Sequence, residues 1–312
     1  MKRRTTRVLS IILFAAMMLQ ALGLTAAAAT QGSTAPQQTS GAQDYGLPAK
    51  TKDGVIFHAW NWSFDNITNN LPAIAEAGFK SIQTSPIQAS KEALTDGSKW
   101  WVLYQPTNFQ IGNTQLGSRE QFKRLCEEAE KYGISIIVDV IANHTGNAGG
   151  GALEVQPAHN VDPVLKNNPN FWHSPAKHVE SWDRRWNVTQ QGIGLPDLNT
   201  SNQELQNIII AFLNDAISLG ADGFRFDAAK HIELPDDPDN AGSNFWPRVL
   251  GSLTNKENLY IYGEVLQGGA DRFNDYATYM NLAADKYGHN IRDAVGFSSS
   301  KNVDTAKFYS AG

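Results

Sequence analysis

Short, continuous apolar runs alternate with helical patterns from Gly54 onward, and this rhythm constrains the fold more than any other feature of the chain. Five runs are predicted to be strands, and they cover residues 55–60, 81–85, 136–140, 223–227 and 259–263. Strands that are apolar throughout, rather than at alternate positions, are typical of sheets buried on both faces. The pattern therefore predicts an α/β fold with a parallel sheet covered by helices.

Three helical patterns separate these runs. The first is short and is expected around residues 71–77, ending at Gly78. The two later helices each begin with a predicted capping box and end at a glycine. These signals are Ser118 with Gln121 and Gly133, and Ser201 with Glu204 and Gly220.

Residues 145–198 interrupt the alternation, since they are rich in Gly, Asn, Pro, His and Trp and show no helical period. A segment of this length between a strand and the next helix indicates an inserted subdomain. The Gly-Gly-Gly run at 149–151 is not followed by the Lys-Ser/Thr pair of a phosphate-binding loop.

The first 29 residues have the three parts of a secretory signal: a basic start, an apolar run at 8–24 and small residues at 27–29. A membrane anchor is the alternative, but the run is short for a span and contains Ser10 and Gln20. We expect export, cleavage, a secreted extracellular location and no membrane contact afterwards. Residues 30–50 are polar and small, which predicts a flexible leader.

The net charge of −5 is dispersed along the chain, which argues against nucleic acid as a partner and favours a neutral substrate. Cys126 is the single cysteine, so no intrachain disulfide can form. Exported proteins without disulfides often depend on a large core or a metal, and calcium is therefore worth seeking. We expect a monomer.

Polar side chains collect at the expected carboxyl ends of the strands, where barrels of parallel strands place their functional groups. They are Asn143, His144, Arg225, Asp227, Lys230, His231 and Glu264. Two carboxylates at successive strand tips, Asp227 and Glu264, are the pair that glycosidic cleavage needs. Arg225 shares a strand face with Asp227 and would keep that carboxylate ionised. The alternative is structural, because an Asp at this place can cap the following helix.

Four segments, in this order and spacing, resemble the conserved regions of the α-amylase family (glycoside hydrolase family 13). They are DVIANH at 139–144, LPDLN at 195–199, GFRFDAAKH at 223–231 and GEV at 263–265. The flanks HAWNWSF (58–64), WVLYQPT (101–107) and IELPDD (232–237) are most similar to Bacillus subtilis-type bacterial α-amylases. The resemblance runs from about residue 52 to at least residue 297. It implies a (β/α)8 TIM-type barrel with a B subdomain inserted after the third strand.

The resemblance also implies the catalytic roles. Asp227 would be the nucleophile, Glu264 the general acid and then base, and Arg225 the arginine beside the nucleophile. Asp139 would hold the strand end and Arg225, and the alternative is that it binds sugar directly. The implied reaction is endo-hydrolysis, with retention, of α-1,4-glucosidic bonds in starch, glycogen and maltooligosaccharides.

Substrate and metal residues follow from the same resemblance. Six residues are implied to contact the glucan: Tyr104, His144, Lys230, His231, Trp100 and Gln105. A Ca²⁺ ion is implied between the barrel and the insert, with side-chain oxygens from Asn143 and Asp197 and main-chain oxygens from Thr189 and His231. The alternative is that Asn143 and Asp197 only bind loop backbone.

The chain departs from the family at its end, because no Asp preceded by a His supplies the third catalytic carboxylate. We expect about six of the eight barrel strands, with 51–144 and the truncated segment 199–312 as the two barrel parts and 145–198 as the insert. Open sheet edges predict poor solubility and weak or no turnover. A non-catalytic glucan-binding remnant, and a transglycosylase or exo-acting relative, remain alternatives.

Overall fold

The computed structural model describes residues 45–93, 98–266 and 268–294. Six parallel strands form one sheet in the order β1-β2-β5-β6-β7-β8. Their bounds are β1 (Val55–Ala59), β2 (Phe79–Thr84), β5 (Ser135–Ile141), β6 (Gly223–Asp227), β7 (Tyr260–Gly263) and β8 (Asn281–Leu282). The prediction of an incomplete barrel with six of eight strands is confirmed. The expected signal at 1–29, most of the leader at 30–50 and the tail after residue 294 lie outside the described residues.

The sixth strand is the one that the apolar pattern did not locate. Strand β8 has two residues, and it pairs through Tyr262 with Asn281 and through Gly263 with Leu282. Two residues are too few to produce a recognisable run, although they extend the sheet beyond β7.

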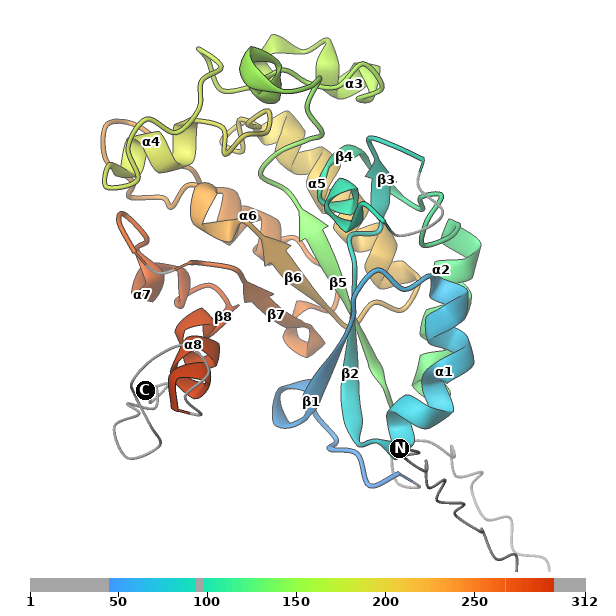
Figure 1. Cartoon of the computed structure of the whole chain (residues 1–312). Coiled ribbons are helices and arrows are strands. Elements are labelled where there is room, and N and C mark those ends of the chain that lie inside the picture. The colour runs from blue at the N-terminus through green and yellow to red at the C-terminus, as the bar shows by residue number, and fades with distance from the viewer. Residues whose placement is uncertain (1–44, 94–97, 267, 295–312) are drawn as a thin grey trace, which may run out of the picture. The chain divides into compact units, whose positions relative to one another are not determined.

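Helices cover the sheet between the strands, as Figure 1 shows for α1, α2 and α5. The helices are α1 (Phe64–Glu76), α2 (Arg119–Lys131), α3 (Pro163–Lys166), α4 (Arg185–Gln190), α5 (Gln203–Ser218), α6 (Phe245–Gly251), α7 (Phe273–Tyr276) and α8 (Asp285–Ala294). The rings of Phe64 and Phe122 pack edge to face at 5.4 Å between α1 and α2. Cys126 is buried in α2, where it packs against Gly220.

The helix starts were predicted with mixed success. The capping box of Ser118 and Gln121 is present at the start of α2. Helix α1 begins earlier than expected, at Phe64, because the Ser63 side chain accepts the Asn66 N–H and caps it. The capping box at Ser201 was wrong: the Asn202 side chain caps α5, and Ser201 donates to Asn199 instead.

Two features lie above the carboxyl ends of the strands in Figure 1. One is a two-stranded antiparallel sheet of β3 (Gln88–Ser90) and β4 (Pro106–Ile111), joined by a short helix at Trp100–Tyr104. The other is the insert, which follows β5 and contains α3 and α4. Leu47, near the end of the expected leader, is buried in the core.

In the part of the chain that the structure describes, no helix has both the length and the apolar character needed to cross a bilayer.

Candidate active site

The two predicted catalytic carboxylates sit at the tips of neighbouring strands. Asp227 is the last residue of β6, and Glu264 directly follows β7. The register of the two strands places Phe226 beside Gly263, so the residues that follow them emerge side by side. The absence of a side chain at Gly263 leaves room for Met280, because a Cβ there would lie 2.7 Å from the sulfur of Met280.

Arg225 binds both carboxylates at once. Its Nη1 lies 2.7 Å from Asp227 Oδ1, and its Nη2 lies 3.2 Å from Glu264 Oε1. The prediction that Arg225 faces the same space as Asp227 is confirmed. One planar guanidinium therefore brings the two acids together over the barrel mouth.

Ala228 turns the chain sharply after Asp227. It has a φ of 50°, a left-handed conformation that costs a non-glycine residue about 1 kcal/mol. In this conformation its N–H donates to Glu264 Oε2 at 3.2 Å. The Glu264 side chain keeps 30% of its surface exposed, against 13% for Asp227, so it faces the open side of the site. The alternative that Asp227 caps the next helical turn is not supported, because the turn at Ala229–His231 has no side-chain cap.

Burial dominates the protonation of Asp227. Desolvation raises the pKa of this carboxyl to about 7, although Arg225 acts to lower it and Asp139 adds to the rise. Three carboxylates contact the single charge of Arg225, so the cluster carries excess negative charge.

Asp139 lies beneath the site and is fully buried. Both of its oxygens accept from Arg225 Nη1, at 2.8 and 3.0 Å, which confirms that it holds this arginine. It also accepts from Tyr104 Oη at 2.9 Å and from Gln83 Nε2 at 3.3 Å. The reasoning from sequence missed Gln83, which reaches across the barrel interior and also accepts from Tyr262 Oη.

His144 is buried and neutral. Burial lowers its pKa to about 4. Its Nε2 donates to the Tyr104 carbonyl at 3.1 Å, so Nδ1 is the acceptor that faces the Asn143 amide at 3.4 Å. Both ring nitrogens therefore have protein partners, and the predicted contact of His144 with a sugar stays a prediction.

Aromatic side chains surround Tyr104. Its ring lies 5.8 Å from that of Trp60 and 6.1 Å from that of Trp100. Trp100 is 43% exposed, so its ring is accessible for the predicted contact with the glucan. Gln105 has a buried Oε1 without a hydrogen-bond partner among the described residues, and its predicted contact with the glucan stays a prediction.

Lys230 and His231 follow the β6 turn. Lys230 Nζ donates to the Gly268 carbonyl at 2.8 Å. His231 Nδ1 donates to the Val188 carbonyl in the insert at 2.8 Å, and burial lowers the pKa of this imidazole to about 4. The His231 ring is thus used to hold the insert.

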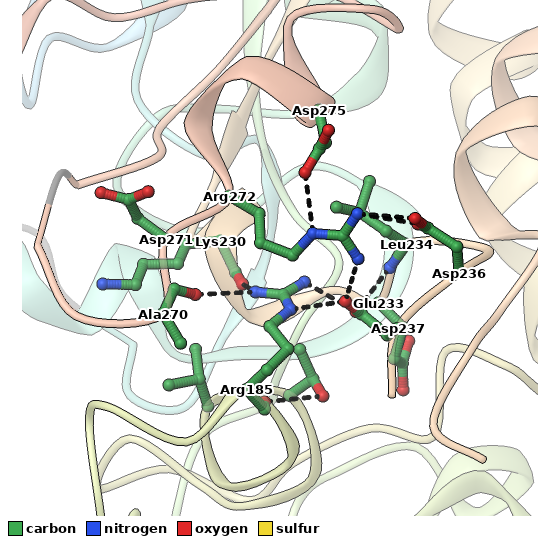
Figure 2. Close-up of polar contacts among 12 residues, drawn as sticks. Arg185, Lys230, Glu233, Leu234, Asp236, Asp237, Ala270, Asp271, Arg272 and Asp275 are labelled. Carbon is green, nitrogen blue, oxygen red and sulfur yellow. Dashed lines mark hydrogen bonds and ion pairs between the residues drawn. The ribbon is translucent and has the colours of Figure 1, made fainter. Parts of the chain in front are cut away.

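Figure 2 shows a buried charge cluster beneath this turn, centred on Arg185 of α4. Arg185 binds Asp237 through two bonds of 2.8 Å, from Nε and from Nη2. Its Nη1 donates to the carbonyls of Lys230 at 2.8 Å and Ala270 at 3.4 Å. Tyr276 accepts from Nη2 in the same cluster. Arg185 therefore joins the insert to the segments that follow β6 and β7, a link that the sequence pattern did not reveal.

The structure brings two of the four candidate metal residues, Asn143 and Asp197, into direct contact. Asn143 Nδ2 lies 3.3 Å from Asp197 Oδ1, and both side chains are buried. Thr189 is fully buried next to Val188, the residue to which His231 is bound. Amide, carboxylate and carbonyl oxygens suit a hard cation.

The charge balance in this region also fits a cation. His173 lies between two buried acids, with Nδ1 2.7 Å from Asp197 and Nε2 3.0 Å from Glu233. Burial lowers the pKa of His173, but Asp197 and Glu233 outweigh this and raise it to about 10. Two carboxylates with one imidazolium leave a net negative charge, which a calcium ion would offset. Among the described residues, no three His, Cys, Asp or Glu side chains are grouped to hold a metal, so main-chain oxygens would be needed.

Comparisons with known proteins point to one family. The family model "Alpha amylase, catalytic domain" matches residues 63–309. An α-amylase of Clostridium acetobutylicum is 49% identical over 267 residues, and an α-amylase of Butyrivibrio fibrisolvens is 38% identical over 270 residues. These matches cover 84% and 78% of this chain. They cover only 34% and 27% of the two relatives, so this chain spans between about a quarter and a third of their length.

A solved structure has the same fold. It is a variant of α-amylase I from Eisenia fetida in complex with maltohexaose, with a TM-score of 0.67 and 25% sequence identity. The match covers 82% of this chain and 53% of that chain.

Proposed function

This chain belongs to the alpha-amylase family, and on that premise we propose that its barrel is the catalytic part of an endo-acting glycoside hydrolase. Its substrates would be starch, glycogen and maltooligosaccharides, cleaved at α-1,4-glucosidic bonds with retention. The observation that carries the proposal is the binding of both Asp227 and Glu264 by the one guanidinium of Arg225. Two carboxylates bound to one guanidinium must lie close together, and retaining enzymes need a separation of about 5–5.5 Å between their two carboxyl groups.

The residues take different roles because their surroundings differ. Asp227, the less exposed of the two acids, would attack the anomeric carbon and form a covalent glucosyl intermediate. Glu264, which is more exposed, would protonate the leaving oxygen and then activate water. Arg225, held by Asp139, would keep Asp227 oriented and stabilise its ionised form.

The maltohexaose bound to the Eisenia fetida relative supports a glucan as ligand. The exposed aromatic rings around Tyr104 offer flat apolar faces for sugar rings. By the family resemblance, Lys230 and His231 would border the leaving-group side.

The third acid that the family resemblance implies has no counterpart in the 312 residues. We therefore propose that the 312-residue polypeptide binds glucan but turns it over weakly, because hydroxyl contacts that strengthen in the transition state are missing.

Two further parts of the proposal concern the metal and the location. Asn143, Asp197 and the main-chain oxygens of Thr189 and His231 would hold one Ca²⁺, which would join the insert to the barrel and offset the buried negative charge. The signal-type start of the sequence supports export, followed by action as a monomer outside the cell.

Covalent trapping tests the mechanism without requiring turnover. The chain would be incubated with 5-fluoro-α-glucosyl fluoride, and intact-mass and peptide mass spectrometry would locate the label. We expect one fluoroglucosyl group on Asp227 and none in Asp227→Asn. Labelling of another residue, or the absence of any label while maltoheptaose still binds, would favour the non-catalytic glucan-binding alternative. If labelling occurs, added maltose as acceptor would distinguish transglycosylation from hydrolysis.

A further inference from the structure

One polar side chain from each of five neighbouring strands joins a single hydrogen-bonded layer beneath the two candidate catalytic acids. The layer consists of His58 of β1, Gln83 of β2, Asp139 of β5, Arg225 of β6 and Tyr262 of β7. The strand register aligns His58 with Gln83, and it aligns Arg225 with both Asp139 and Tyr262. Gln83 contacts three of the other members, although the proposed mechanism gives it no role.

The partners of Gln83 fix the direction in which its amide points. Asp139 binds Arg225 as a carboxylate and can only accept, so the Gln83 atom 3.3 Å from Asp139 Oδ2 is the amide nitrogen Nε2. The carbonyl Oε1 of Gln83 then accepts from the Tyr262 hydroxyl. The second N–H of Nε2 donates to His58 Nε2 at 3.3 Å, which requires a neutral imidazole. Burial lowers the pKa of His58, in agreement with this form.

The Gln83 amide is therefore held in one orientation. The side chain is buried, and both of its N–H groups and its carbonyl oxygen have partners. Turning the amide over would leave these groups unpaired, at a cost of about 1–3 kcal/mol for each. Tyr262 holds the carbonyl end across the barrel interior, so the nitrogen end stays directed at Asp139.

This direction matters because Asp139 and Asp227 share one arginine. Arg225 Nη1 lies 2.8 Å from Asp139 Oδ1 and 2.7 Å from Asp227 Oδ1. Asp139 Oδ2 also accepts from Tyr104 and from Gln83. Each donor on a buried carboxylate stabilises its charge. The bond from Gln83 therefore leaves more of the positive charge of Arg225 available to Asp227.

We propose that Gln83 is a positioning residue: held by Tyr262 and bonded to Asp139, it keeps Arg225 placed to hold Asp227 ready for attack. The inference rests on the proposed function, since it concerns the reactivity of the proposed nucleophile. The contacts of Gln83 are to His58, Asp139 and Tyr262, so its effect on Asp227 passes through Asp139 and Arg225.

The pH dependence of labelling by 5-fluoro-α-glucosyl fluoride tests this, with Gln83→Leu as the variant. Leucine has a similar volume but cannot donate to Asp139, so Asp139 would attract Arg225 more strongly and Asp227 would be harder to ionise. We expect the midpoint of the pH profile to rise by about one unit, which makes labelling at pH 7 about fivefold slower. The rate on the alkaline plateau should be kept, because the ionised form still attacks.

A second variant keeps the test decisive if Gln83→Leu does not fold. Tyr262→Phe removes the hydroxyl that holds Gln83 Oε1 and lets the amide tilt away from Asp139. We expect a smaller shift of the midpoint in the same direction. In the double variant, Tyr262→Phe should add nothing to the shift caused by Gln83→Leu, because the hydroxyl acts through the amide.

The matched control is Gln206→Leu. Gln206 is also a buried glutamine, but its amide nitrogen binds the Thr200 carbonyl and Asn244 instead of Asp139. This variant should lower the melting temperature without moving the midpoint. A midpoint that did not rise in Gln83→Leu and Tyr262→Phe, or that rose equally in Gln206→Leu, would overturn the inference and leave the proposed function standing. If the unsubstituted chain took up no label, the proposed function would be wrong and the inference would fall with it.

Discussion

Arg185 Nε lies 2.8 Å from Asp237 Oδ1, and this buried pair joins the insert to the segment that follows β6. Asp237 also accepts from Arg272 Nη1 at 2.8 Å, so two arginines from different segments meet on one carboxylate. The contact involves no metal. This pair therefore attaches the insert to the barrel in addition to the His231–Val188 hydrogen bond and the proposed calcium site.

Removing Arg185 should destabilise the fold strongly. In Arg185→Ala, Asp237 stays buried, loses its bidentate partner and keeps Arg272, which should cost about 3 kcal/mol in the free energy of unfolding. Urea unfolding followed by tryptophan fluorescence measures this. The control is Arg119→Ala, whose pair with Asp215 is exposed and contributes about 1 kcal/mol or less. If the free energy of unfolding fell equally in the two variants, the buried pair would contribute no more to stability than the exposed pair.

The reactivity of Asp227 should depend on pH around neutrality. Burial raises the pKa of its carboxyl to about 7, and only the ionised form can attack. The rate of labelling by the fluoroglucosyl fluoride should be constant above pH 8 and roughly a hundredfold lower at pH 5. A rate that halves only near pH 4 would mean that Arg225 outweighs burial.

Calcium should stabilise the protein through Asp197. At a concentration of about a hundred times its dissociation constant, a bound ion adds about 2.7 kcal/mol to the free energy of unfolding. We expect the melting temperature of the EDTA-treated chain to rise on adding Ca²⁺ and to rise less with Mg²⁺, which demands a stricter geometry. Asp197→Asn should abolish the calcium response. A response of the same size in that variant would place the ion elsewhere.

Asp222, at the amino-terminal end of β6, should make stability fall as pH rises. Burial raises its pKa from the ordinary 3.8 to about 6, although the Ile136 N–H opposes this. The folded state therefore binds this proton more tightly than the unfolded state, and stability is lost between about pH 4 and pH 6.

Asp222→Asn should remove this dependence, because the amide oxygen can still accept the Ile136 N–H and carries no charge. At pH 7 the variant should be more stable on the order of 1–2 kcal/mol. Denaturation at pH 4, 5, 6 and 7 checks this, with the exposed Asp215→Asn as control. If the free energy of unfolding of the variant still fell between pH 4 and pH 6 as in the unsubstituted protein, groups other than Asp222 would be responsible for the pH dependence.

The sequence predicted the sheet and its functional edge because the strands are continuous apolar runs and their polar neighbours stand at the tips. Asp227, Glu264 and Arg225 were placed correctly for this reason. The local sequence pattern could not show which residue caps α5, because Ser201 and Asn202 are both good helix caps.

Contacts between distant segments could not be predicted in this way. Arg185 and Asp237 are 52 positions apart, and the insert that contains Arg185 has no periodicity to show which face is buried. Gln83 looks like a polar strand residue, and only the closure of the strands around Asp139 shows that it points inward. Glu233 and His173 escaped notice for the same reason, since neither stands at a strand tip.

The burial of Cys126 on the inner face of α2 has a practical consequence. It is the only thiol in the chain, and burial raises its pKa well above the usual range, so it is shielded from alkylating reagents. A cysteine introduced at an exposed position of the insert would then react alone. A single spectroscopic probe could be attached there without first removing the native residue, and it would report movement of the insert as calcium or glucan is added.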